Sequence, residues 1–259
     1  MGEWINRQRR VLGTGFSFLV FGLGGLALGG VVFPLVRLTV SDGPRRHAVS
    51  REILRHAFRF FIELMRRVGV LSYELVGFER LERRGLLILA NHPSLIDTLF
   101  VLAFVRGCNC VVNAALSRNP FTLGAVRSAG YLTSDSGVAV IAECIAALEQ
   151  GGNVLIFPEG TRTPLSGEIK LRRGAANIAI RGRRDITPVI VHCSPRTLTK
   201  GEKWWHVPSR KAEYVLEVRD DIAVSPFLAG SREPAIAVRQ LTAHLQQYFS
   251  TEARADAVA

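Results

Sequence analysis

The chain reads Gly85-Leu86-Leu87-Ile88-Leu89-Ala90-Asn91-His92-Pro93-Ser94-Leu95-Ile96-Asp97 at residues 85–97. The apolar run that precedes Asn91 predicts a short, buried strand. Pro93 is favoured in the first turn of a helix, so the strand should lead directly into one. This order of strand, polar turn and helix is typical of an α/β fold.

The same alternation extends on both sides of this stretch. Strands are expected near residues 71–76, 85–90, 109–113, 153–157, 186–192 and 212–219, and helices near residues 95–105, 119–128, 137–150, 172–182 and 234–249. The pattern predicts one α/β domain over residues 71–259, with a mixed, largely parallel sheet covered by helices. In such sheets, functional loops follow the carboxyl ends of the strands.

Two polar motifs stand at such positions. His92 and Asp97 follow the first quoted strand, and Phe157-Pro158-Glu159-Gly160-Thr161-Arg162 closes the strand near residues 153–157. A neutral imidazole is the usual base near pH 7, and a nearby carboxylate can orient it. The plainer alternative is a histidine near a helix start with a solvated aspartate, and a surface Glu159–Arg162 pair that closes a loop.

Both motifs resemble those of the lysophospholipid (glycerolipid) O-acyltransferases of the 1-acylglycerol-3-phosphate acyltransferase type. The resemblance extends over about residues 85–191, and includes Leu171-Arg172-Arg173-Gly174-Ala175 and Ile186-Thr187-Pro188-Val189. One block departs from the family pattern, because Gly130-Tyr131-Leu132-Thr133-Ser134-Asp135-Ser136 ends in a serine where the family usually has arginine. That difference leaves the head group of the acceptor open.

The resemblance implies a membrane-bound enzyme that moves a fatty acyl group from acyl-CoA or acyl-carrier protein to the hydroxyl of a lysophospholipid. Conversion of lysophosphatidate to phosphatidate is the first expectation. His92 would be the general base and Asp97 would orient it. Backbone N–H groups of residues 93–95 could hold the oxyanion. By resemblance, the acceptor would be bound by Glu159, Gly160, Thr161, Arg162 and Arg172.

Other functions remain open. The run Leu198-Thr199-Lys200-Gly201-Glu202-Lys203-Trp204-Trp205 is similar to a branch found in specialised lipid pathways, which suggests an aryl polyene or ornithine-lipid type of acceptor. A catalytically silent membrane lipid-binding protein is a further alternative. A lipid hydrolase is disfavoured because the chain lacks a Gly-x-Ser-x-Gly elbow. Ser94 stands too close to His92 along the chain to be a well-placed nucleophile.

Residues 1–40 are expected to form a membrane anchor. Residues 11–40 are nearly uncharged and exceed the roughly 20 apolar residues that cross a bilayer. A tilted single helix is favoured over a re-entrant hairpin hinged at the glycines between residues 22 and 30. The larger basic cluster follows the run, so the catalytic domain should lie on the cytoplasmic side of the cell inner membrane.

Residues 41–70 carry arginines between apolar residues at helical spacing, which predicts a basic amphipathic helix at the membrane interface. The alternative is an ordinary surface helix of the α/β domain. The formal net charge of +11 suits a membrane surface, a phosphate substrate and an acidic acyl-carrier protein or coenzyme A. No nucleic-acid-binding motif accompanies that charge, so no nucleic acid partner is expected.

The cysteines lack metal-ligand spacing, so buried reduced thiols are expected. The chain should need neither a metal nor a cofactor, with acyl-CoA or acyl-carrier protein serving as co-substrate. Trp204 and Trp205 could be interfacial anchors or core residues, and their sequence context does not separate the two.

Overall fold

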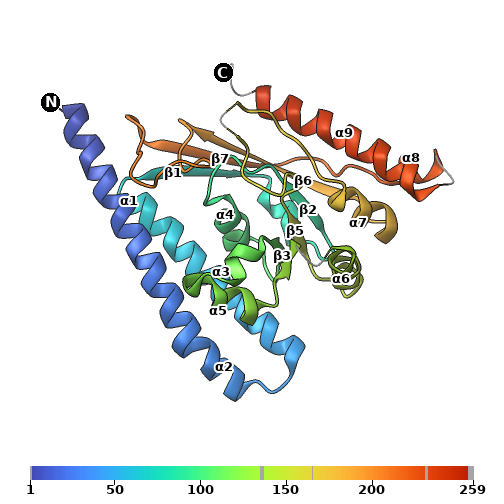
Figure 1. Ribbon diagram of the computed structural model, residues 1–259, viewed down its shortest axis with the longest axis horizontal. Coiled ribbons are helices and arrows are strands. Elements are labelled where there is room, and N and C mark those ends of the chain that lie inside the picture. Colours follow the sequence, from blue (N-terminus) through green and yellow to red (C-terminus); the bar gives the residue numbers. More distant parts are fainter. Residues whose placement is uncertain (1, 135–136, 165, 231–232, 256–259) are drawn as a thin grey trace.

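A sheet in the strand order β1-β7-β6-β2-β5-β3-β4 runs through the centre of the molecule (Figure 1). This computed structural model describes residues 2–134, 137–164, 166–230 and 233–255. Neighbouring strands are parallel except β6 and β7, which are antiparallel. The predicted fold class, a mixed and largely parallel sheet covered by helices, is confirmed.

The strands are β1 (Leu71–Val76), β2 (Leu87–Ala90), β3 (Asn109–Val112), β4 (Leu132–Thr133), β5 (Val154–Ile156), β6 (Ile186–Ser194) and β7 (Ala212–Val218). Every strand except β4 lies where the sequence predicts one. The two residues of β4 are too few to produce a periodic pattern, and the strand exists because β3 offers it a partner.

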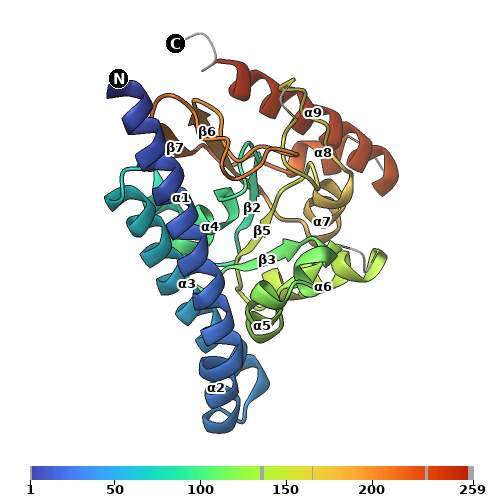
Figure 2. The ribbon, with the colours of Figure 1, turned by 60° about the vertical axis from the view of Figure 1, so that its left-hand side comes forward.

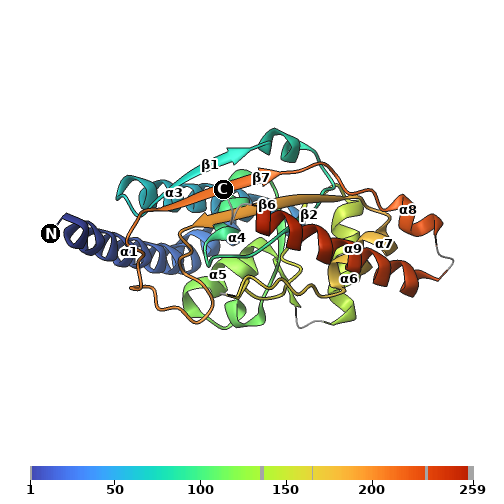
Figure 3. The same cartoon turned by 90° about the horizontal axis from the view of Figure 1, so that it is seen from above.

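The α-helices are α1 (Gly2–Ala27), α2 (Phe33–Thr39), α3 (Gly43–Arg67), α4 (Asp97–Phe104), α5 (Pro120–Ala129), α6 (Val138–Glu149), α7 (Gly174–Gly182), α8 (Ser225–Ala229) and α9 (Pro234–Ala255). Figure 2 shows α1, α3 and α4 on one side of the sheet and α6, α7 and α9 on the other. Figure 3, seen from above, shows the N-terminal end of α1 at one end of the molecule and helix α8 at the other.

Strand β2 shows how the sheet is buried on both faces. Ile88 and Ala90 belong to the core beneath α3 and α4, whereas Leu87 and Leu89 belong to the core beneath α6, α7 and α9. Successive side chains of a strand point to opposite faces, so a strand covered on both sides must be apolar throughout. This explains the uninterrupted apolar run that ends just before the His92 turn.

The N-terminal helix runs from Gly2 to Thr39 without reversing direction, because a π-helical turn, Leu28–Val32, joins α1 to α2. The chain therefore forms the favoured continuous helix and not the alternative hairpin. Glycines between residues 22 and 30 are points of close contact with α5 instead of a hinge. A Cβ atom on Gly25 would lie 2.2 Å from the carbonyl oxygen of Phe121, so glycine lets α1 approach α5 closely.

Helix α3 begins at Gly43, where the Asp42 side chain accepts a hydrogen bond from the Arg45 N–H at 2.8 Å. The structure confirms an amphipathic helix over most of residues 41–70. Its apolar side chains, however, lie in the protein core: Leu54, Phe61 and Ile62 are at most 3% exposed. These are the side chains that the sequence assigned to a membrane interface. They are covered instead because α1, α4 and α5 pack against α3.

The remaining expectations concern single side chains. Cys108, Cys110 and Cys144 are buried and unpaired, as predicted, and Cys193 is partly buried. Trp204 and Trp205 are 43% and 45% exposed, so they are surface residues.

Candidate active site

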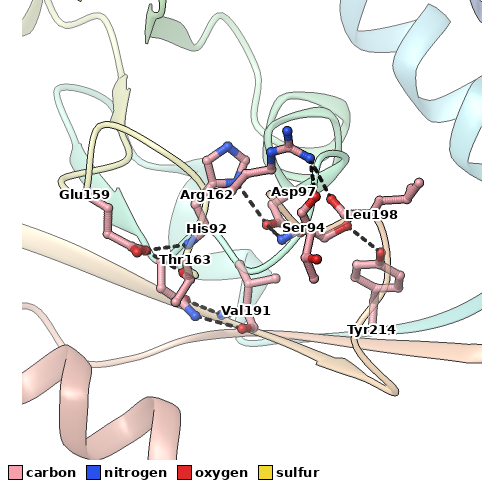
Figure 4. A network of polar contacts seen from close by, with 11 residues as sticks. His92, Ser94, Asp97, Glu159, Arg162, Thr163, Val191, Leu198 and Tyr214 are labelled. Carbon is pink, nitrogen blue, oxygen red and sulfur yellow. Dashed lines mark hydrogen bonds and ion pairs between the residues drawn. The ribbon is translucent and has the colours of Figure 1, made fainter. Parts of the chain in front are cut away.

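The two polar motifs meet at one edge of the sheet. Strands β2 and β5 are parallel neighbours, so their carboxyl ends lie side by side and bring together the turns that follow them. The backbone N–H of His92 donates to Oε1 of Glu159 at 2.9 Å, across 67 residues of sequence (Figure 4). The N–H of Thr163 returns a bond to the carbonyl oxygen of His92 at 2.7 Å.

His92 and Asp97 form a hydrogen-bonded pair. Nδ1 of His92 lies 3.0 Å from Oδ2 of Asp97, whose side chain is 0% exposed, whereas the His92 side chain is 16% exposed. The imidazole stacks against Phe157, with the ring centroids 4.3 Å apart. A carboxylate accepts only, so Nδ1 carries the proton and Nε2 is left as the basic nitrogen. The structure thus brings into contact the two side chains that the sequence predicts to act as a pair.

Burial raises the pKa of Asp97, and the hydrogen bonds from His92 and from the Ser94 N–H oppose that rise. Its second oxygen, Oδ1, is buried without a hydrogen-bond partner in the part of the chain that the structure describes. A dry carboxylate interacts strongly with a positive charge on the adjacent ring. Asp97 can therefore stabilise the imidazolium that forms when His92 takes up a proton.

The turn between His92 and Asp97 differs from the prediction. Helix α4 begins at Asp97, and Pro93 belongs to the turn that precedes it. The Ser94 N–H donates to Asp97 Oδ2 at 2.6 Å, and the Leu95 N–H donates to the Leu198 carbonyl at 3.1 Å. The expectation that backbone N–H groups of residues 93–95 hold an oxyanion is wrong, because both available donors are used and proline has none.

The structure adds Tyr214, which the sequence did not single out. Its hydroxyl lies 2.8 Å from Oγ of Ser94, and both residues are at most 1% exposed. Burial raises the pKa of Tyr214 well above its usual value, which keeps the hydroxyl neutral. Ser94 is thus bonded to a tyrosine of β7 and is not a nucleophile paired with His92. The only sequence signal was an apolar alternation along β7, which marks Tyr214 as inward-facing but says nothing of its partner.

The role of the Asn91 side chain was not indicated by the sequence either. Its side chain donates to the Val191 carbonyl at 2.9 Å and accepts from the Val191 N–H at 2.7 Å. This pair of bonds fastens the end of β2 to β6 after the strands diverge. An asparagine directly after an apolar strand could have suggested such a bridge, although not its partner.

Glu159, which the resemblance assigns to binding of the acyl acceptor, is hydrogen-bonded within the protein instead. Its Oε1 accepts from the His92 N–H and from the Thr163 hydroxyl, both at 2.9 Å, and the residue is 5% exposed. Burial raises the pKa of its carboxyl. Glu159 therefore ties the second motif to the backbone of the first, which fixes where His92 stands.

Arg162 is half-buried, and its Nη1 donates to the carbonyl oxygens of Leu198 and Thr199 at 2.9 and 2.8 Å. Figure 4 shows the guanidinium beside the imidazole of His92. Nη2 and Nε are bonded to no group within the described residues. The side chain can thus hold the loop at residues 198 and 199 while it presents positive charge to the site.

The exposed Gly160 has a φ of 68°, in the left-handed region that favours glycine. A Cβ atom there would lie 2.7 Å from Nε of Arg172, so this exposed arginine lies across the turn. Thr161 is exposed next to it. The expected acceptor-binding residues therefore surround one turn, with Arg162 on its His92 side and Arg172 across Gly160.

The two remaining points are the divergent block at residues 130–136 and metal binding. Asp135 and Ser136, which end the divergent block, lie outside the residues that the structure describes. Across the described ranges, no group of three His, Cys, Asp or Glu side chains could hold a metal ion. The chemistry that these residues can perform is proton transfer at Nε2 of His92, next to a positively charged arginine.

Comparison with known proteins gives the following relatives. Residues 72–192 match the family model described as Acyltransferase. The 1-acyl-sn-glycerol-3-phosphate acyltransferase of Pseudomonas aeruginosa is 30% identical over 148 residues, 54% of this chain and 56% of that protein. The protein of the same name from Saccharomyces cerevisiae is 31% identical over 150 residues, 51% of this chain and 47% of the relative. This chain spans about half the length of these curated relatives.

A crystal structure is also similar. The 1-acyl-sn-glycerophosphate (LPA) acyltransferase PlsC from Thermotoga maritima superposes with a TM-score of 0.69, over 98% of each chain and at 18% sequence identity. At that identity the similarity establishes the fold, including the helices that precede the sheet.

Proposed function

We propose that this chain is a membrane-bound O-acyltransferase, because residues 72–192 match the family model described as Acyltransferase. It moves a fatty acyl group from acyl-CoA or acyl-carrier protein to the hydroxyl of a lysophospholipid. Lysophosphatidate, which would become phosphatidate, is the acceptor that the names of the relatives suggest.

One observation carries this proposal: at the carboxyl edge of the sheet, His92 bonds to Asp97 through Nδ1, and its Nε2 has no hydrogen-bond partner among the described residues. In the proposed reaction, Nε2 removes the proton from the acceptor hydroxyl as its oxygen attacks the thioester carbonyl. The tetrahedral intermediate then expels the thiolate, which takes the proton from the imidazolium. Asp97 stays ionised throughout and holds the ring in one tautomer.

Arg162 supplies positive charge to the same site. Because Nη1 is engaged by the carbonyls of Leu198 and Thr199, the acceptor phosphate would bind the remaining guanidinium N–H groups. Arg172, across Gly160, provides a second cation for it. Thr161, exposed on the same turn, would add a hydroxyl contact.

The proposal also assigns the membrane-facing side of the molecule. Helix Trp4–Thr39 is long and apolar enough to cross a membrane. Its outward face carries a row of exposed large side chains: Leu12, Phe16, Leu19, Leu23, Leu26, Val31, Leu35 and Leu38. We propose that this row, the α1 stripe, enters the bilayer. The arginines after it keep the catalytic domain on the cytoplasmic side of the cell inner membrane.

A specialised acceptor, of the aryl polyene or ornithine-lipid type, is the second candidate. The observation that favours it is the serine at residue 136, where the family usually has an arginine. With one basic residue fewer, a less strongly charged head group becomes more suitable.

The test uses the purified full chain in detergent. Lysophosphatidate, a lyso-ornithine lipid and an uncharged monoacylglycerol are each offered with acyl-CoA and with acyl-carrier protein, and the products are identified by mass spectrometry. His92→Ala should lower the rate by about 10²–10⁴, the usual effect of losing a general base. His206→Ala, at an exposed histidine outside the site, is the matched control. Normal turnover by a folded His92→Ala protein would exclude the mechanism.

A further inference from the structure

A pocket lies along α1, away from the candidate active site. It has a volume of about 700 Å³, is open on one side, and is lined by residues of α1, the π-helical turn, α2, α3 and α5. Figures 1 and 2 show this region at the end of the molecule where α2 leads into α3. None of its lining residues belongs to the two motifs. Its walls combine apolar and cationic side chains, chiefly Phe33, Pro34, Leu123, Arg37, Arg46 and Arg127.

The pocket begins beside an irregularity in the helix. Gly29, in the π-helical turn, touches Gly124 of α5 so closely that a Cβ atom on Gly124 would lie 2.5 Å from the Gly29 Cα. Gly29 and Gly124 themselves line the pocket. Single π-helical turns are rare and occur frequently at functional sites.

The three arginines give the pocket its charge. Arg37 and Arg127 are exposed and Arg46 is half-buried. Among the described residues, none of the three forms an ion pair with a carboxylate. They come from different helices, so the fold brings like charges together around one opening. Guanidinium groups bind phosphate through paired N–H donors, and a bound anion would offset their repulsion.

Ser50 supplies an independent observation. The residue is 0% exposed and lines the pocket, and its hydroxyl has no hydrogen-bond partner within the described part of the chain. Buried hydroxyl groups are nearly always bonded, so an unpaired one calls for a partner that the protein itself does not provide. A hydroxyl of a residue that lines a cationic pocket can donate to an anionic oxygen.

We propose that this pocket is a second, non-catalytic site that binds a phosphate-headed lipid. The phosphate contacts Arg37, Arg46 and Arg127 and accepts from Ser50, and part of an acyl chain lies on Phe33 and its apolar neighbours. The volume lies in the range of pockets for whole organic ligands and far exceeds that of a phosphate ion. Leu26, an exposed member of the α1 stripe, also lines the pocket, which joins the site to the proposed membrane face.

The test measures binding by native mass spectrometry of the full chain in detergent. The probes are dioctanoylphosphatidylglycerol, dioctanoylglycerol and inorganic phosphate, each at matched concentrations. The phosphatidylglycerol should bind at least about tenfold more tightly than either of the others. Equal binding of inorganic phosphate would identify a simple anion site, and equal binding of dioctanoylglycerol would identify an apolar site; either result overturns the proposal.

The charge is tested with the triple variant Arg37→Gln, Arg46→Gln and Arg127→Gln, which should lose at least about tenfold in phosphatidylglycerol affinity. The control changes three exposed arginines outside the pocket: Arg45→Gln, Arg106→Gln and Arg118→Gln. It removes the same total charge and should bind as the wild type does. Equal losses in the two triple variants would show that net charge alone attracts the lipid, and would overturn the site.

The space is tested separately with Gly30→Leu, which places a large apolar side chain at the wall of the pocket. A Cβ atom on Gly30 or on Gly24 would meet nothing within 4 Å, but only Gly30 lines the pocket. Gly30→Leu should therefore lose phosphatidylglycerol binding, and Gly24→Leu should retain it. Thermal unfolding of both variants verifies that they fold. Undiminished binding by a folded Gly30→Leu protein would overturn the proposal, whatever the outcome of the catalytic assays.

Discussion

Asp97 is hydrogen-bonded both to the proposed base and to the backbone of the turn that carries it. One oxygen, Oδ2, serves both the His92 ring and the Ser94 N–H, while the other is buried without a partner in the described structure. Such an arrangement costs stability, because a charged group is kept from water. Proteins retain such costs mainly where function requires them.

Asp97→Asn should therefore lose activity without losing the fold. The amide oxygen can replace Oδ2 as an acceptor, but a neutral amide does not stabilise the imidazolium of His92. A fall in kcat of about 10²–10⁴ is expected, as for other aspartates that orient a catalytic histidine. Initial rates of acyl transfer and circular dichroism of the same preparation measure the two effects. Full activity in the folded variant would remove Asp97 from the mechanism.

The pH dependence of stability has a definite sign for this residue. Burial raises the pKa of Asp97, so the folded protein binds this proton more readily than the unfolded chain does. Ionised Asp97 therefore destabilises the fold at high pH. That effect decreases as the pH falls below the folded-state pKa and is absent below the unfolded-state pKa. The unfolding temperature of Asp97→Asn relative to wild type should be highest at alkaline pH and should decline on acidification. A difference that does not change with pH would contradict this.

Arg162 combines two roles that kinetics can separate. Arg162→Ala removes the support of residues 198 and 199 as well as the charge, so kcat/KM should fall for every acceptor. The fall for lysophosphatidate should be larger by about ten- to a hundredfold, because a charge-assisted hydrogen bond contributes about 1.5–3 kcal/mol. Comparison with an uncharged monoacylglycerol measures the difference. Equal losses for both acceptors would leave Arg162 with the structural role alone.

At this scale, the sequence indicated the His92–Asp97 pair but not the residues that hold it in place. His92 and Asp97 could be predicted because both follow one apolar strand closely. The role of Glu159 could not, since its hydrogen bonds depend on the side-by-side pairing of β2 and β5. Tyr214 lies 120 residues from Ser94 in sequence, and only the folded sheet brings them together.

At the scale of elements, periodicity predicted most strands and helices to within a few residues. Periodicity did not predict the features that depend on contacts with other elements of the fold. Helix α4 begins at Asp97 instead of near residue 95, after a turn in which the Ser94 N–H donates to Oδ2 of Asp97. The apolar face of α3 could equally have met lipid or protein, since both environments favour the same amphipathic pattern. Packing against α1, α4 and α5 settled that choice.

The glycines of α1 allow a matched prediction about packing. Gly25→Ala places a methyl group 2.2 Å from the Phe121 carbonyl oxygen, so α1 must move away from α5. At Gly24 a Cβ atom meets nothing within 4 Å, and Gly24→Ala should be neutral or stabilise the helix by up to about 1 kcal/mol. Thermal unfolding in detergent should therefore show a lower midpoint for Gly25→Ala only. Equal midpoints would mean that α1 is not held tightly against α5.

At the scale of the whole molecule, the proposed function implies two kinds of contact with a membrane. The formal net charge of +11 favours binding to an anionic membrane surface, and salt weakens that attraction. The α1 stripe runs along a helix whose other side is packed on the domain, through contacts such as that of Gly13 with Val70. These two features make separable contributions to binding, because only the charge responds to ionic strength.

The α1 stripe should accordingly determine binding to neutral vesicles. Leu12, Leu19 and Leu23 are 73%, 59% and 58% exposed, so changing all three to glutamine leaves the core intact. Burial of each leucine in lipid contributes about 1.5–3 kcal/mol, and the triple variant should lose at least about a hundredfold in affinity for phosphatidylcholine vesicles in flotation assays. Val76→Gln, Leu116→Gln and Ile236→Gln, which change exposed apolar residues elsewhere, form the control. With anionic vesicles, the stripe variant should retain binding that disappears at high salt. Undiminished binding to neutral vesicles would mean that another surface enters the bilayer.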